Sequence, residues 1–169
     1  MNLDAIQLLA FDVDGVMTDG KILLSPDGQE FKAFCAQDGA ALRWLAKAGF
    51  RVAIISGRSS NAVQVRARDL GIERVYLGVH EKRVVLSDLL VREGLGLEQV
   101  SYMGDDLMDL PVLTQVGWSI TVPEAPVDVR ERVDYVTTLS GGAGAVREMV
   151  EHFLRHRGLW DSLVAEYLE

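Results

Sequence analysis

IQLLAFDVDG, residues 6–15, joins a short apolar run to an acidic turn. Residues 6–11 are apolar at nearly every position, which is typical of a strand buried on both faces of a parallel sheet. Asp12 and Asp14 follow this run at once. Because ligands bind beyond the carboxyl ends of parallel strands, the two acids are predicted to lie where such a fold places its active site.

Similar apolar runs recur along the chain and alternate with helical patterns. Four more strands are predicted, at residues 52–55, 75–77, 100–103 and 118–122. Helical patterns occur at residues 40–48, 60–70, 82–92 and about 108–113. Strands that alternate with helices favour right-handed crossovers and a parallel sheet. We therefore predict one α/β domain over residues 1–169, a Rossmann-like parallel sheet with helices on both faces.

Two segments depart from this alternation. Residues 21–34 hold two strand-like stretches around Asp27-Gly28, which indicates a protruding β-hairpin with apolar residues on both faces. The C-terminal tail, about residues 141–169, starts with the glycine-rich GGAGA and continues as two amphipathic helical patterns, expected to lie on the core or on a neighbouring subunit. Neither segment is large enough to form a cap domain.

The composition narrows the possible partners and the location. A net charge of −8 leaves no basic stripe for broad binding to nucleic acid or to an anionic membrane. No apolar run approaches the roughly 20 residues of a bilayer-spanning helix. Cys35 is the single cysteine, so an internal disulfide cannot form. We expect a cytoplasmic protein that binds neither nucleic acid nor membrane.

Polar residues gather at the predicted ends of three strands. Asp12, Ser56 and Asp105 each follow an apolar strand directly, so the sheet should bring them to one edge. Any one of these residues could be a helix N-cap or a turn former. Three others accompany them in the sequence: Asp14, Lys82 and Asp106. The combination indicates an active site.

These residue types suit phosphoryl transfer through a covalent aspartyl phosphate. Asp12 is placed to be the nucleophile, and Asp14 is placed to protonate the leaving oxygen and later to take a proton from water. The hydroxyl of Ser56 and the backbone N–H of Gly57 could hold phosphate oxygens. Lys82, at the start of a predicted helix, could meet the same phosphate.

A hard cation would complete such a site. The oxygen ligands on offer are Asp12, the carbonyl of Asp14 and Asp105, with Asp106 or Asp109 behind them. Oxygen ligands select Mg²⁺ rather than Zn²⁺, and the three histidines show no ligand spacing with the cysteine. The sequence therefore predicts a magnesium site.

The motifs resemble those of a known enzyme family. DVDGVMTDG (12–20), SGR (56–58), Lys82 and GDDLMD (104–109) match, in order, the four motifs of the haloacid dehalogenase-like phosphatases. QDGAALRWL (37–45), GGAGAVREM (141–149) and GLWDSLVAEYL (158–168) are similar to the cap-less 3-deoxy-D-manno-octulosonate 8-phosphate phosphatases.

The resemblance implies a Mg²⁺-dependent phosphatase that acts on an acidic eight-carbon phosphosugar on the route to lipopolysaccharide. It also implies a homotetramer in which the hairpins pair into a central barrel and each C-terminal tail reaches a neighbour's active site. By the family pattern Asp12 is the nucleophile, Asp14 the acid/base, and Ser56 and Lys82 the phosphate ligands. The implied metal ligands are Asp12, Asp14 and Asp105.

Four positions bear on the substrate. Gln37 stands where the octulosonate phosphatases usually carry arginine, which keeps a phosphatase of nine-carbon 2-keto-3-deoxy sugar acid 9-phosphates open as an alternative. Arg58, Arg66 and Arg147 are candidates for contacts to a substrate carboxylate or phosphate. Each of the three could equally be a surface or intrahelical ion-pair residue.

A phospho-accepting receiver domain of a signalling protein is the non-enzymatic alternative. Receivers also gather aspartates, a hydroxyl and a lysine at the end of a parallel sheet. However, they place the acidic pair on the first strand and the phosphorylated aspartate on the third, whereas here the DxD pair comes first. A second acid at Asp14 also favours turnover over storage of a phosphoryl group.

Overall fold

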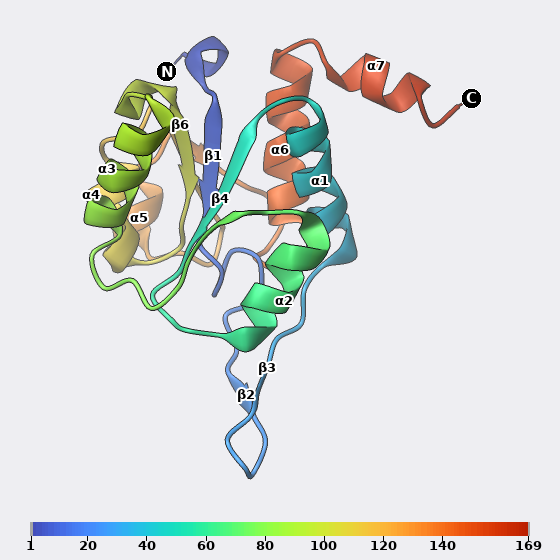
Figure 1. Cartoon of the computed structure of the whole chain (residues 1–169). Coiled ribbons are helices and arrows are strands. Elements are labelled where there is room, and N and C mark those ends of the chain that lie inside the picture. The colour runs from blue at the N-terminus through green and yellow to red at the C-terminus, as the bar shows by residue number, and fades with distance from the viewer. Residues whose placement is uncertain (1, 169) are drawn as a thin grey trace.

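The computed structural model describes residues 2–168, which contain one six-stranded sheet with all neighbouring strands parallel (Figure 1). The strand order is β5-β4-β1-β6-β7-β8. The strands are β1 (Leu8–Phe11), β4 (Arg51–Ile55), β5 (Arg74–Tyr76), β6 (Val100–Met103), β7 (Trp118–Thr121) and β8 (Tyr135–Val136). This confirms the predicted α/β fold class.

Strand β1 lies at the centre of the sheet and its four residues are fully buried. Its last residue, Phe11, pairs with Ile54 of β4 on one side and with Met103 of β6 on the other. The chain runs from β1 to β4 and β5 in one direction and then returns to β6 on the opposite side of β1. The strand order therefore reverses next to β1, and the crevice beyond its carboxyl end is the expected ligand site.

Helices cover both faces of the sheet (Figure 1). On one face lie α1 (Ala36–Lys47), α2 (Asn61–Leu70) and α6 (Ala145–His156), and on the other lie α3 (Lys82–Glu93), α4 (Leu110–Leu113) and α5 (Val127–Arg130). Short 3₁₀ turns form η1 (Leu3–Ala5), η2 (Leu97–Gln99) and η3 (Leu107–Asp109). None of the helices in residues 2–168 combines the length and the apolarity needed to cross a membrane.

The hairpin forms where Asp27-Gly28 predicted it, but its ladder is short. Strands β2 (Leu23–Leu24) and β3 (Glu30–Phe31) pair antiparallel and project from the base of the sheet (Figure 1). Gly28 has φ +84° and its N–H donates to the carbonyl of Ser25 over 2.9 Å. In the part of the chain that the structure describes, only this hairpin and α1 separate β1 from β4, so no cap domain covers the strand ends.

The tail packs more closely than its glycines suggest. Gly141 and Gly142 lie against the backbone of Gly15 and Thr18, where an added Cβ would collide, and the N–H of Gly142 donates to the carbonyl of Val16 over 2.9 Å. GGAGA is therefore a site of close backbone approach and not a mobile linker. Helix α6 buries its apolar row on its own core, and α7 (Trp160–Ala165) continues from it across α1.

Candidate active site

The turn after β1 presents Asp12 at the strand tip. The backbone N–H of Asp12 donates to the carbonyl of Met103 over 2.9 Å, which ties the turn to β6. The carboxylate accepts the N–H of Val13 through Oδ1 over 2.7 Å. Gly15 has φ +85°, and a Cβ at this position would collide with the Asp105 carboxylate. Glycine is therefore needed at position 15 both for the turn and for the close approach of the loop that carries Asp105.

Lys82, at the start of α3, is buried among carboxylates. Its Nζ donates to Asp12 Oδ2 over 2.6 Å and to Asp109 Oδ1 over 2.7 Å. Only 5% of Lys82 is exposed. Burial opposes the charged form, but the nearby carboxylates of Asp12 and Asp109 outweigh it and raise the pKa of Lys82. The ammonium is thus a fixed positive charge beside the proposed nucleophile.

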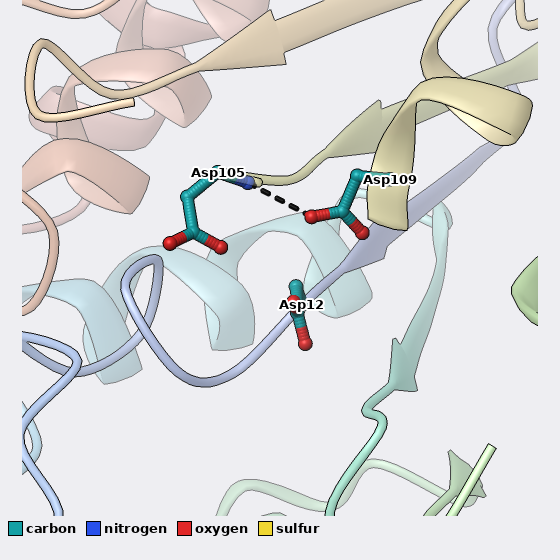
Figure 2. Close-up of side chains that lie close together, drawn as sticks. All are labelled: Asp12, Asp105 and Asp109. Carbon is teal, nitrogen blue, oxygen red and sulfur yellow. Dashed lines mark hydrogen bonds between the residues drawn. The ribbon is translucent and has the colours of Figure 1, made fainter. Parts of the chain in front are cut away.

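Asp109 accepts hydrogen bonds from several residues of this cluster. Its Oδ1 accepts from Lys82 and from the Tyr102 hydroxyl, the latter over 2.7 Å. Its Oδ2 accepts the backbone N–H groups of Asp105 at 3.0 Å and Asp106 at 3.2 Å. The bond to the N–H of Asp105 is drawn in Figure 2. These four bonds use the lone pairs of both carboxylate oxygens, so Asp109 positions its neighbours and adds negative charge beside a cation instead of binding it directly.

Asp105 has no such partners. Within residues 2–168 its carboxylate accepts no hydrogen bond and pairs with no cation, although it lies beside Asp12 and Asp109 (Figure 2). Burial, followed by the charges of Asp12 and Asp109, raises the pKa of Asp105 to about 7. Burial and the charge of Asp109 likewise raise the pKa of Asp12 to about 6, against the opposing effect of Lys82.

These acids fit a divalent cation. Oxygen atoms of Asp12, Asp105 and Asp109 lie within 4.8 Å of one another. One ammonium does not compensate three carboxylates, and a cation bound between Asp12 and Asp105 would oppose the burial and the repulsion that raise their pKa values. The donors are all oxygens, which Mg²⁺ prefers. Asp12 and Asp105 would hold the ion, and the resemblance to the family predicts the carbonyl of Asp14 as a third ligand.

An open cleft of about 290 Å³ lies over this cluster. It is lined by Asp12, Asp14, Gly20, Ser56, Gly57, Arg58, Lys82, Asp105, Asp106, Met108 and Asp109. Ser56 is buried at the end of β4, where its N–H donates to the carbonyl of Tyr76 over 2.9 Å. Most of the residues singled out from the sequence therefore meet in one cleft.

Three predicted residues differ from their expected place. Arg66 pairs with Asp69 at 2.9 Å and does not line the cleft. The Arg147 guanidinium lies 4.1 Å from the centre of the Trp44 ring, also outside the cleft. Within this chain neither arginine lies at the predicted substrate site, and both contact other side chains of the protein instead. Asp106 was expected behind the cation ligands, but it is exposed at the edge of the cleft, where it caps η3 by accepting the N–H of Leu107 over 2.7 Å.

Sequence reasoning missed two contributors to the site. Tyr102 lies within β6, and its hydroxyl donates a hydrogen bond to Asp109. In the sequence it reads as one more residue of a buried strand. Lys32 follows β3 and forms an ion pair with Asp14 Oδ1, although no motif marks it. Neither contact could be read from local sequence, because the first depends on the direction of a strand side chain and the second joins residues far apart in the chain.

The strand order and the acids at the strand ends define the class of haloacid dehalogenase-like hydrolases, and the sequence model of that family matches residues 75–149. The 3-deoxy-D-manno-octulosonate 8-phosphate phosphatase KdsC of Escherichia coli K12 is 43% identical over 156 residues, 92% of this chain and 83% of that protein. The chain belongs to the family of the 3-deoxy-D-manno-octulosonate 8-phosphate phosphatases. It is therefore a phosphatase, and the receiver-like alternative is wrong.

Solved structures of relatives agree closely with this fold. The phosphatase of this family from Moraxella catarrhalis, in complex with magnesium, phosphate and KDO, has a TM-score of 0.96 and 41% identity, covering 98% of this chain and 95% of its own. The cobalt-bound enzyme from Haemophilus influenzae has a TM-score of 0.94 and 37% identity, covering 99% of each chain.

Proposed function

We propose that this chain hydrolyses 3-deoxy-D-manno-octulosonate 8-phosphate to the free sugar acid and phosphate, with Mg²⁺ as cofactor and an aspartyl phosphate on Asp12 as intermediate. The observation that carries the proposal is the cluster of Asp12, Lys82 and Asp105 at one sheet edge, in a chain 43% identical to KdsC of Escherichia coli K12. Relatives that hold magnesium or cobalt support the choice of a divalent cation.

In the first step a carboxylate oxygen of Asp12 forms a bond to phosphorus while the bond from phosphorus to the C8 oxygen breaks. Asp14 gives its proton to that oxygen, so the sugar leaves as an alcohol. Lys82 holds Asp12 in place and offsets the negative charge of the phosphoryl group. Mg²⁺, when bound by Asp12, Asp105 and the carbonyl of Asp14, supplies further positive charge next to the phosphoryl oxygens.

In the second step water attacks phosphorus and the bond to Asp12 breaks. Asp14 takes the proton of the attacking water, which restores the acid for the next cycle. Ser56 and Gly57 line the same cleft, and their hydroxyl and N–H would hold the phosphoryl oxygens through both steps. Arg58, also in the cleft wall, is the one candidate arginine left on this chain for a substrate anion.

A homotetramer built through the hairpin forms part of the proposal. Ile22, Leu23, Leu24 and Phe31 are between 51% and 62% exposed. Two-residue strands are too short to be stable alone, so pairing with other hairpins would both bury these side chains and extend the ladder. Tyr167 and Leu168, 70% and 82% exposed, are the part of the tail that a neighbouring subunit could cover. A cytoplasmic location accords with the single free cysteine.

Phosphate release tests the activity. The wild type should release phosphate from the eight-carbon 8-phosphate in the presence of Mg²⁺ and lose this activity with a chelator. Asp12→Asn should be inactive, whereas Asp128→Asn, the same change at an exposed site on α5, should leave the rate unchanged. Preference for a nine-carbon 9-phosphate would overturn the substrate assignment and would connect Gln37, exposed on α1, with the change of sugar.

The oligomer has a separate test. Light scattering at micromolar concentration should give about four times the 18.6 kDa chain mass. Leu23→Asp, which places a charge on the exposed hairpin, should give smaller species. A wild-type monomer would contradict this part of the proposal and leave the hydrolysis itself untouched.

A further inference from the structure

A ring of four alternating charges joins the hairpin to the active site. Lys32 Nζ pairs with Asp14 Oδ1 and lies 3.2 Å from Glu30 Oε1. Glu30 Oε2 accepts from Arg58 Nη2 over 2.8 Å. Arg58 Nε lies 3.9 Å from Asp14 Oδ2 and so closes the ring. Glu30 belongs to β3 and Lys32 follows it, whereas Asp14 and Arg58 belong to loops after β1 and β4.

Burial distinguishes this ring from a surface ion pair. The Lys32 side chain is 1% exposed, although the apolar residues of the same hairpin are more than half exposed. A buried ammonium is costly unless carboxylates compensate it, and Asp14 and Glu30 both do so. Lys21, at the other foot of the hairpin, shows the contrast: it pairs with Asp19 but its side chain is 77% exposed.

We propose that Lys32 is a positioning residue for the acid/base Asp14, a role that rests on the hydrolysis proposed above. The ammonium holds Oδ1, which fixes the rotation of the carboxyl group. Oδ2 lies 3.9 Å from Arg58 Nε, beyond hydrogen-bond distance, and is the oxygen that gives and takes the proton. An aspartate side chain has a soft terminal torsion, so without this contact the acid samples orientations that miss the leaving oxygen. Small misplacements of a reacting group slow catalysis strongly.

Through this ring the hairpin also positions Asp14, in addition to presenting an apolar surface. Glu30 and Lys32 move with β3, so the position of the hairpin sets the position of the Asp14 carboxylate. When the hairpin is in this position, it therefore holds the Asp14 carboxylate in place.

Lys32→Met tests the inference, because it keeps an unbranched side chain of nearly the same length and removes the charge. The kcat for the sugar phosphate should fall on the order of tenfold to a hundredfold with little change in KM. Lys32→Arg should recover part of the rate, and the matched control Lys21→Met should retain the wild-type kcat. An aryl phosphate such as p-nitrophenyl phosphate needs no proton on its leaving oxygen, so Lys32→Met should release its first equivalent of nitrophenolate at nearly the wild-type rate.

The outcomes separate the two proposals. A wild type without phosphatase activity would refute the proposed function, whereas an active wild type with equal kcat in Lys32→Met and Lys21→Met would refute the role of Lys32. Asp14→Asn supplies a second test: adding Lys32→Met should cost less than about threefold more if lysine acts through Asp14. An additional tenfold loss would overturn the inference. Should Lys32→Met fail to fold, Glu30→Gln takes its place, and an unchanged kcat there would also overturn it.

Discussion

Acidification should weaken magnesium binding in this protein, because the cation must displace protons from its own ligands. Burial and the charge of Asp109 raise the pKa of Asp12 to about 6. Burial and the charge of Asp12 raise the pKa of Asp105 to about 7. Both acids are ionised at pH 8, whereas at pH 5.5 both are largely protonated in the metal-free protein. Mg²⁺ binds the ionised forms, so the affinity must fall with pH.

The two pKa values set the size of the effect. Between pH 8 and pH 5.5 protonation of Asp105 lowers the apparent affinity roughly 30-fold and protonation of Asp12 roughly fourfold. Together they amount to about a hundredfold, or about 3 kcal/mol of binding free energy.

Calorimetric titration with Mg²⁺ at pH 5.5, 6.5 and 8 measures this dependence directly. Near pH 6, repeating the titration in buffers of different ionisation enthalpy should show that more than one proton leaves for each ion bound. Asp105→Asn should weaken binding and flatten the pH profile. The control Asp106→Asn removes a neighbouring exposed charge and keeps a capping side chain, so it should shift the profile only slightly. A magnesium affinity that stays constant between pH 5.5 and 8 would refute the reasoning.

Three further predictions follow from the same contacts. First, the pKa of Asp105 is higher in the folded protein than in the unfolded chain, so its contribution to stability is present at low pH and is lost as pH rises from about 4 through about 7. Urea unfolding with a chelator at pH 5 and 7.5 should show a decline to which Asp105 contributes at most about 2.5 kcal/mol, and the decline should be smaller in Asp105→Asn, where the part due to Asp12 remains. Second, Gly15→Ala and Gly28→Ala both force alanine to positive φ, at about 1–3 kcal/mol of stability each, but only Gly15→Ala should also lose magnesium affinity in calorimetry, since its Cβ meets Asp105 whereas that of Gly28 meets nothing within 4 Å. Third, Tyr102→Phe should lower the unfolding free energy by about 1–2 kcal/mol and kcat several-fold, whereas Tyr135→Phe, which removes one hydrogen bond to Glu148 outside the cleft, should leave kcat unchanged.

Local sequence sufficed for the parts of this fold that repeat a simple pattern. Continuous apolar runs marked five of the six strands of the sheet, and the acids that follow them reached one edge because parallel strands end together. Strand β8 was missed because Tyr135–Val136 is two residues long and only half-buried, and α5 was missed because Val127–Arg130 makes a single turn. Elements this short are fixed by the sheet beside them, which no local pattern encodes.

Long side chains were the least predictable part of the site. Arg147 follows the pattern of a helix that packs on the core, but its guanidinium stacks on Trp44 of another helix. No motif marks Lys32, yet it is buried against Asp14. In both residues a flexible stem lets the charge reach a partner that lies far away in the sequence. The sequence therefore shows that lysines and arginines are available to a site, but it does not show which of them reaches it.

Lys82 alone does not neutralise the acidic residues of the site. Asp12, Asp105 and Asp109 bring three negative charges together, and Lys82 contributes one positive charge that it shares between Asp12 and Asp109. The oxygens of Asp109 accept hydrogen bonds from Lys82, Tyr102 and two backbone N–H groups. The negative charge that remains uncompensated therefore lies on Asp12 and Asp105. Two unit charges on oxygen ligands match one divalent cation. An approaching phosphate dianion would be repelled by this edge of the sheet without that cation, which makes the metal a condition of substrate binding as well as of chemistry.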